Sequence, residues 1–207
     1  MKQLSTGAFV SLLLLSAISI LAQSKDSSTA AKRKFKHDAE FVSSYDKSKD
    51  QTAVVMQLYD VEWPTGVDIF KRGTWIDRQD YRLDIQAAFV YSGRVITKPS
   101  TSLQFEIRVK HPGKASFIKS SMPELIADVD QDSISLGPTT LVSSKTFVPT
   151  DRPSQLSYEQ VSAHFTYEGL IRLTNAKLVK MKVGDVEFTL KEYHLEALRD
   201  LGSRMVP

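Results

Sequence analysis

Apolar and polar residues alternate along most of the chain after residue 40, which is the period-two pattern of β-strands. The clearest run is 103–110, where odd-numbered positions are apolar and even-numbered positions are polar or charged. The run 81–91 follows the same rule over most of its length. Successive side chains of a strand point to opposite faces, so each run should bury one face and expose the other. The pattern therefore predicts antiparallel sheet packed on one side against a core.

Further strand patterns bring the expected number of strands to seven to nine. They occupy the runs 53–61, 125–129, 134–136, 141–148, 161–167, 179–183 and 186–190. The last two runs are separated only by Gly184-Asp185. Two alternating runs joined by two turn residues, with glycine first, predict a β-hairpin.

Helical patterns are confined to the last third of the chain. A short helix is expected within 168–175. A longer one should close the chain, because Thr189 and Glu192 have the spacing of a capping box. An apolar stripe at steps of three and four follows, formed by Leu195, Leu198, Leu201 and Met205. The pattern as a whole predicts a mostly β fold, an antiparallel β-sandwich with a C-terminal α-helix; a barrel is the alternative.

The first 39 residues have a different composition from the rest. Residues 1–22 combine one lysine, an apolar run and small residues at the end, which is the layout of a secretory signal peptide. The apolar run is shorter than the roughly 20 residues of a membrane span. Residues 23–39 are rich in Ser, Thr, Ala and Lys, and we expect a flexible basic arm there. A single domain should then occupy 40–207, with no membrane span after signal cleavage.

The amino-acid composition limits the cellular compartments and the classes of binding partner that we expect. The chain contains no cysteine, which excludes disulfides and thiolate metal sites. An exported domain without disulfides fits a bacterial envelope, so we expect the periplasm or the extracellular space. The net charge is +3, and removing residues 1–22 takes away only the positive charge of Lys2. Such a weak charge gives no case for nucleic acid binding.

Two segments resemble a type of small β domain found in exported bacterial proteins of unknown function. They are FVSSYDK at 41–47 with KDQT at 49–52, and 170–199 with its Val183-Gly184 turn, EFTL at 187–190 and LEALR at 195–199. The resemblance covers about residues 40–205. It implies an exported β domain, and it implies no activity, ligand or catalytic residue.

No motif for catalysis, a cofactor or phosphate binding is present. The histidines His37, His111, His164 and His194 lie far apart in sequence, and we expect all four at the solvated surface. A hydrolase site assembled from distant residues stays open as one hypothesis. We expect no cofactor and no enzymatic activity.

Alternate acids at Asp128, Asp130 and Asp132 match the start of a calcium loop. Two later positions depart from that pattern, because Ser133 stands where glycine is needed and Thr139 where glutamate is needed. We therefore favour a solvated hairpin turn between Val129 and Ile134 over a metal site.

The segment 62–80 carries the other candidate site. It contains both tryptophans, Trp63 and Trp75, together with Arg72 and Arg78. Such a stretch is longer than most connections between strands, and long loops often carry recognition. Aromatic rings and arginines suit a glycan or a small ligand, although tryptophans that cap the core would give the same sequence.

Three functional hypotheses follow from the sequence. The first is a non-catalytic envelope domain with a structural or protein-interaction role. The second is a glycan or small-ligand binding module that uses the Trp63/Trp75 loop. The third is the dispersed hydrolase. Another envelope protein or a glycan is the expected partner.

Overall fold

The computed structural model describes residues 35–59, 61, 82–112, 124–130, 132–148, 150, 155–184 and 186–207. All of them belong to one compact unit, 34–207. The predicted signal peptide and most of the predicted arm lie outside the described residues, so both stay predictions.

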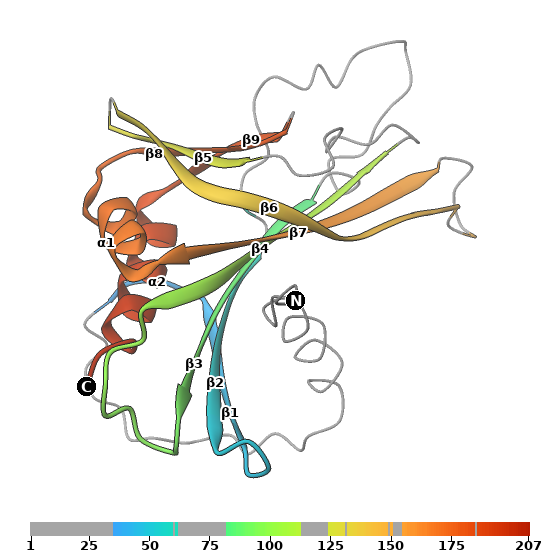
Figure 1. Cartoon of the computed structure of the whole chain (residues 1–207). Helices are drawn as coiled ribbons and strands as arrows, with labels where there is room; N and C mark the ends of the chain where they lie inside the picture. The colour runs from blue at the N-terminus through green and yellow to red at the C-terminus, as the bar shows by residue number, and fades with distance from the viewer. Residues whose placement is uncertain are drawn as a thin grey trace, which may run out of the picture. The chain divides into compact units, whose positions relative to one another are not determined.

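The described residues form nine strands and two helices (Figure 1). In chain order these are β1 (Glu40–Asp46), β2 (Gln51–Leu58), β3 (Arg82–Ser92), β4 (Ser102–Pro112), β5 (Glu124–Val129), β6 (Asp132–Phe147), β7 (Leu156–Thr166), α1 (Tyr167–Asn175), β8 (Val179–Val183), β9 (Val186–Leu190) and α2 (Glu192–Ser203). Neither described helix has the length and apolar character that a membrane crossing needs.

All nine strands pair antiparallel in one sheet of order β1-β2-β3-β4-β7-β6-β5-β8-β9. The predicted mostly β, antiparallel fold with a C-terminal helix is therefore confirmed. The outermost strands, β1 and β9, do not pair with each other within the described residues, so the sheet does not close. The barrel alternative is wrong.

The long strand β6 joins two sections of the sheet. Its first half pairs with β5, up to Pro138, and its second half pairs with β7, from Thr139 onward. Gly137 lies at the change of partner with a φ of 109°, which a side chain would strain. The sequence predicted two strands here, 134–136 and 141–148. The two runs are instead parts of one 16-residue strand, which changes partner at Gly137 and Pro138.

The hydrophobic core lies on one face of the sheet, under both helices. Helix α2 contacts β2 in one section and β9 in the other, and α1 contacts β5, β7 and α2 (Figure 1). The predicted stripe of Leu195, Leu198, Leu201 and Met205 is fully buried there. Each buried leucine of this kind contributes about 1.5–3 kcal/mol relative to an exposed one, so α2 is a main component of the core.

The turn before β9 was predicted correctly, and the start of α2 was not. Val183 pairs with Val186 across a turn in which Gly184 has a φ of 58°. Helix α2 begins after Lys191, whose backbone N–H donates to Nδ1 of His194 at 3.0 Å. The predicted capping residue Thr189 belongs instead to β9. Pairing of β9 continues to Leu190, so the helix can start only beyond it.

Candidate functional site

The face of the sheet opposite the core carries a cluster of polar side chains. On β4 the even-numbered side chains Gln104, Glu106 and Arg108 point to this face, since the odd-numbered ones fill the core. The strand register sets Gln86 of β3 and Ser162 of β7 on either side of Glu106. Four polar side chains from three neighbouring strands therefore surround the carboxylate of Glu106.

Hydrogen bonds connect most of this cluster. Nε2 of Gln104 donates to Oε1 of Glu106 at 2.9 Å, and Nε2 of Gln160 donates to Oε2 at 2.8 Å. The guanidinium of Arg108 donates to Oε2 of Glu106 at 3.2 Å and to Oε1 of Gln86 at 2.6 Å. The Glu106 carboxylate therefore accepts from three side chains, one of which is the cation Arg108.

Glu106 lies beneath its neighbours rather than in solvent. Its exposed fraction is 2%, whereas the side chain of Arg108 is 27% exposed. Two buried atoms of the cluster, Nε of Arg108 and Oγ of Ser162, have no hydrogen-bond partner among the described residues. The amides and the guanidinium thus form a partly exposed layer over a fixed carboxylate.

Two tyrosines lie on the same face at the edge of the cluster. Tyr59, just after β2, is 46% exposed, and the guanidinium of Arg82 lies 5.5 Å from its ring centroid. Tyr158 of β7 is half-buried and pairs with Lys110 in the register. Burial raises the pKa of Tyr158, so its phenol stays neutral at physiological pH. We call this surface the polar platform, and it comprises Tyr59, Gln86, Gln104, Glu106, Arg108, Tyr158 and Gln160.

The sequence did not single out the polar platform. The alternation placed Gln104, Glu106 and Arg108 on a wet face, and it placed Gln86 on the wet face of 81–91. The alternation did not show that the strands at 81–91 and 103–110 pair with each other, or in which register. Without that register no contact between Glu106 and Gln160 could be inferred.

The predicted aromatic site, Trp63, Arg72, Trp75 and Arg78, lies outside the described residues and stays a prediction. Its flanks are described. The chain leaves β2 at Tyr59 and enters β3 at Arg82. Both of these flanking residues lie at the edge of the polar platform.

The predicted hairpin is present between β5 and β6: Asp128 lies in β5, Asp130 in the turn and Asp132 at the start of β6. Asp130 has a φ of 56°, and its Oδ1 accepts hydrogen bonds from the backbone N–H groups of Lys177 at 3.1 Å and Leu178 at 3.2 Å. Asp128 faces Lys180 across the β5–β8 pair. In the part of the chain that the structure describes, no three acidic or histidine side chains group as metal ligands.

Three of the four histidines are not at the solvated surface. His164 is exposed on the polar face of β7, as expected. His111 and His194 are fully buried, because β4 includes His111 on its core face and the His194 side chain accepts from the backbone at the start of α2. The His37 side chain is 6% exposed, and its Nε2 lies 3.0 Å from Oδ2 of Asp200 on α2. The surface expectation was wrong for these three.

A serine, a histidine and a glutamate do meet on the core side of β4 and β7. Ser157 and Glu159 are spaced two residues apart, His111 pairs with Ser157, and Nε2 of His111 lies 3.6 Å from Oε2 of Glu159. All three are at most 4% exposed, and Oγ of Ser157 lies 3.2 Å from Oγ1 of Thr146. A substrate carbonyl could reach Ser157 only if the structure opened. The dispersed hydrolase therefore stays a hypothesis.

Comparisons with protein-family models, with curated proteins and with solved structures found no match. The resemblance to exported bacterial β domains stays a prediction. The function is therefore argued from the side chains of this chain alone.

Proposed function

We propose that the protein is an exported, non-catalytic binding module that recognises a glycan through the polar platform. One observation supports the proposal most directly: amide, guanidinium and carboxylate groups from three strands form a connected layer beside two tyrosine rings. The glycan hypothesis from the sequence is kept, and its location moves from the Trp63/Trp75 loop to the adjoining sheet face.

The chemistry of the polar platform suits a sugar. Side-chain amides donate and accept at once, and a guanidinium donates two parallel bonds, so both match neighbouring hydroxyl groups. Tyrosine rings offer an apolar face for the C–H side of a sugar ring and a phenol for its edge. Because the hydrogen bonds to Glu106 already hold Gln104, Gln160 and Arg108, little side-chain freedom is lost on binding.

The test is calorimetric titration of the purified chain with neutral and acidic oligosaccharides, followed by Tyr59→Ala. Loss of a stacking ring should remove about 1.4 kcal/mol, so the Kd should rise roughly tenfold. The matched control is Tyr193→Ala, since Tyr193 is 38% exposed but lies on α2. If the control weakens binding as much as Tyr59→Ala does, the polar platform is not the site. If no oligosaccharide binds, the glycan proposal fails.

A second candidate, a protein-interaction domain, is favoured by the second half of β6. Residues 143–147 pair with β7, and among the described residues no strand pairs with their other edge. Phe147 and Val148 at its end are 47% and 60% exposed. An unpaired edge with apolar side chains can accept an extended segment of another protein as an added strand.

Site-specific photocrosslinking in the native envelope tests this candidate. A crosslinker at Lys145, on the free edge, should give one discrete adduct. The same group at Leu178, which is 45% exposed away from this edge, should not. Identical adduct patterns at both positions would rule out docking at β6.

A further inference from the structure

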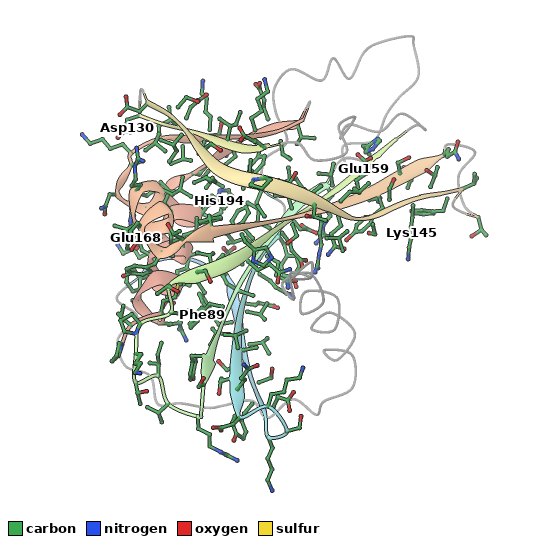
Figure 2. All side chains as sticks on the ribbon, in the orientation of Figure 1. Phe89, Asp130, Lys145, Glu159, Glu168 and His194 are labelled. Atoms are coloured by element: carbon green, nitrogen blue, oxygen red, sulfur yellow. The ribbon has the colours of Figure 1, made fainter. Side chains whose placement is uncertain are left out.

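A small open cleft lies where the β5–β6 turn meets the end of α1, and none of its lining residues belongs to the polar platform. Its volume is about 530 Å³, within the range of small-ligand sites, and its lining residues are Val129, Asp130, Asp132, Arg172, Asn175 and Ala176. Figure 2 shows Asp130 at one end of β6 and Lys145, which pairs with Tyr158 of the polar platform, toward the other. The cleft is therefore independent of the proposed glycan surface.

One wall of the cleft is held in place by Asp130. Its backbone N–H donates to the carbonyl of Leu178 at 3.0 Å, and its Oδ1 accepts the two backbone N–H groups after α1. These bonds tie the β5–β6 turn to the segment between α1 and β8. Asp130 has a structural role, which leaves Asp132 as the carboxylate available to a ligand.

Three polar side chains of the cleft are available to a ligand. Arg172, Asn175 and Asp132 are exposed. Among the described residues, none of the three side chains forms a hydrogen bond, and no ion pair joins Arg172 to Asp132. The last turn of a helix favours a cation, which is one reason for Arg172 on α1. It does not explain an unpaired carboxylate and an unpaired amide on the same cleft.

We propose that this cleft binds a small zwitterion, a molecule with one ammonium and one carboxylate group, such as a free amino acid. Arg172 presents donors that match a carboxylate bidentately, and Asn175 can add one more. Asp132 accepts hydrogen bonds from the ammonium. Val129 and Ala176 contact the carbon chain between the charges.

The spacing between the two charges distinguishes this proposal from weak attraction of ions to a charged surface. The purified chain is titrated with glycine, β-alanine, γ-aminobutyrate and δ-aminovalerate, and binding is followed by amide chemical shifts in NMR spectra. Acetate and methylammonium are the single-charge controls. One zwitterion should saturate the cleft at a concentration at least about tenfold below either control, because it makes both charged contacts at once.

Two charge-removing variants and two matched controls test the residues. Arg172→Gln and Asp132→Asn should each raise the Kd at least about tenfold, the loss expected for one charge-assisted contact. Asp128→Asn, on the same hairpin but outside the cleft, and Arg94→Gln, another exposed arginine, should change it less than about twofold. All four side chains are exposed, so the variants should keep the melting temperature.

Three results would overturn the proposal. The first is that no zwitterion saturates the shifts. The second is that Asp128→Asn weakens binding as much as Asp132→Asn does. The third is that calcium saturates the cleft and the zwitterions do not, which would support a metal site at the β5–β6 turn. None of these results bears on the polar platform, whose test uses other ligands and other residues.

Discussion

Replacing Arg108 by methionine should destabilise the protein, because it leaves the buried carboxylate of Glu106 without a cation. Glu106 is 2% exposed and would keep only the amide donors of Gln104 and Gln160. Methionine retains most of the length of the arginine stem, so the change removes charge and hydrogen bonds more than packing.

The size of the effect follows from the burial of the two partners. Breaking a buried ion pair by removing one partner costs about 3–5 kcal/mol. The side chain of Arg108 is 27% exposed and partly screened by water, so the lower end applies, about 3 kcal/mol. In Glu106→Gln/Arg108→Met both charges are gone, and the penalty of an uncompensated charge disappears. The double variant should therefore lose at least about 1 kcal/mol less than the sum of the single variants.

Urea unfolding of the four proteins at pH 7 measures this coupling. With a denaturant dependence of about 2 kcal/mol per M, the midpoint of Arg108→Met should fall by roughly 1.5 M. Lys98→Met, an exposed lysine outside the cluster, is the control and should change stability by less than about 0.5 kcal/mol. Losses that add within about 0.5 kcal/mol would refute the view that Glu106 and Arg108 act as a charged unit.

Three further predictions concern the core, the corner of the sheet and pH. Leu198→Ala, in the fully buried stripe of α2, should lower the free energy of unfolding by about 2–5 kcal/mol. The control Leu178→Ala, at an exposed site, should lower it by less than about 0.5 kcal/mol. Equal melting temperatures of the two variants would contradict the packing of α2. Gly137→Ala should cost about 1–2 kcal/mol in urea unfolding, because the φ of 109° strains any side chain. Space is not the limit, since the backbone oxygen of His164, at 3.5 Å, is the nearest described atom outside the adjacent residues. An unchanged midpoint would mean that β6 relaxes. Burial raises the pKa of Tyr158 above its ordinary value of 10.0, so the stability that its neutral phenol contributes is complete below pH 10 and is lost as pH rises further. Tyr158→Phe should reduce this loss of stability at high pH. An unchanged dependence of stability on pH in the variant would contradict the prediction.

Strand positions could be predicted from the sequence, because alternation is a local signal. The run 103–110 became the middle of β4, and the Gly184 turn joined β8 to β9. The helix expected within 168–175 became α1. In each case a few neighbouring residues determine the element, and no distant contact is needed.

The errors come from choices that distant contacts decide. Thr189 has the sequence of a helix cap, but pairing of β9 with β8 holds it in a strand. The runs 134–136 and 141–148 were predicted as separate strands, but they belong to one strand, in which β6 exchanges β5 for β7 as its partner. Both predictions agreed with the local sequence, and the pairing of strands in the sheet decided the structure instead.

The candidate sites were hidden for the same reason. Glu106 and Gln160 are 54 positions apart, and their hydrogen bond depends on the pairing of β4 with β7. Arg172 and Asp132 line one cleft only because Asp130 ties two turns together. From its residue type alone, Glu106 was expected in solvent. It is buried because the strand register places polar side chains of the neighbouring strands around it.

The measurement that tests the central claim most directly is an NMR titration of the labelled chain with an oligosaccharide that binds it. The side-chain amide signals of Gln86, Gln104 and Gln160 report on the polar platform, and that of Asn175 reports on the separate cleft. We expect the three glutamine signals to shift in proportion to the fraction of protein that has bound the oligosaccharide, and the Asn175 signal to stay unchanged. Unchanged glutamine signals at saturation would contradict the assignment of the polar platform as the glycan site.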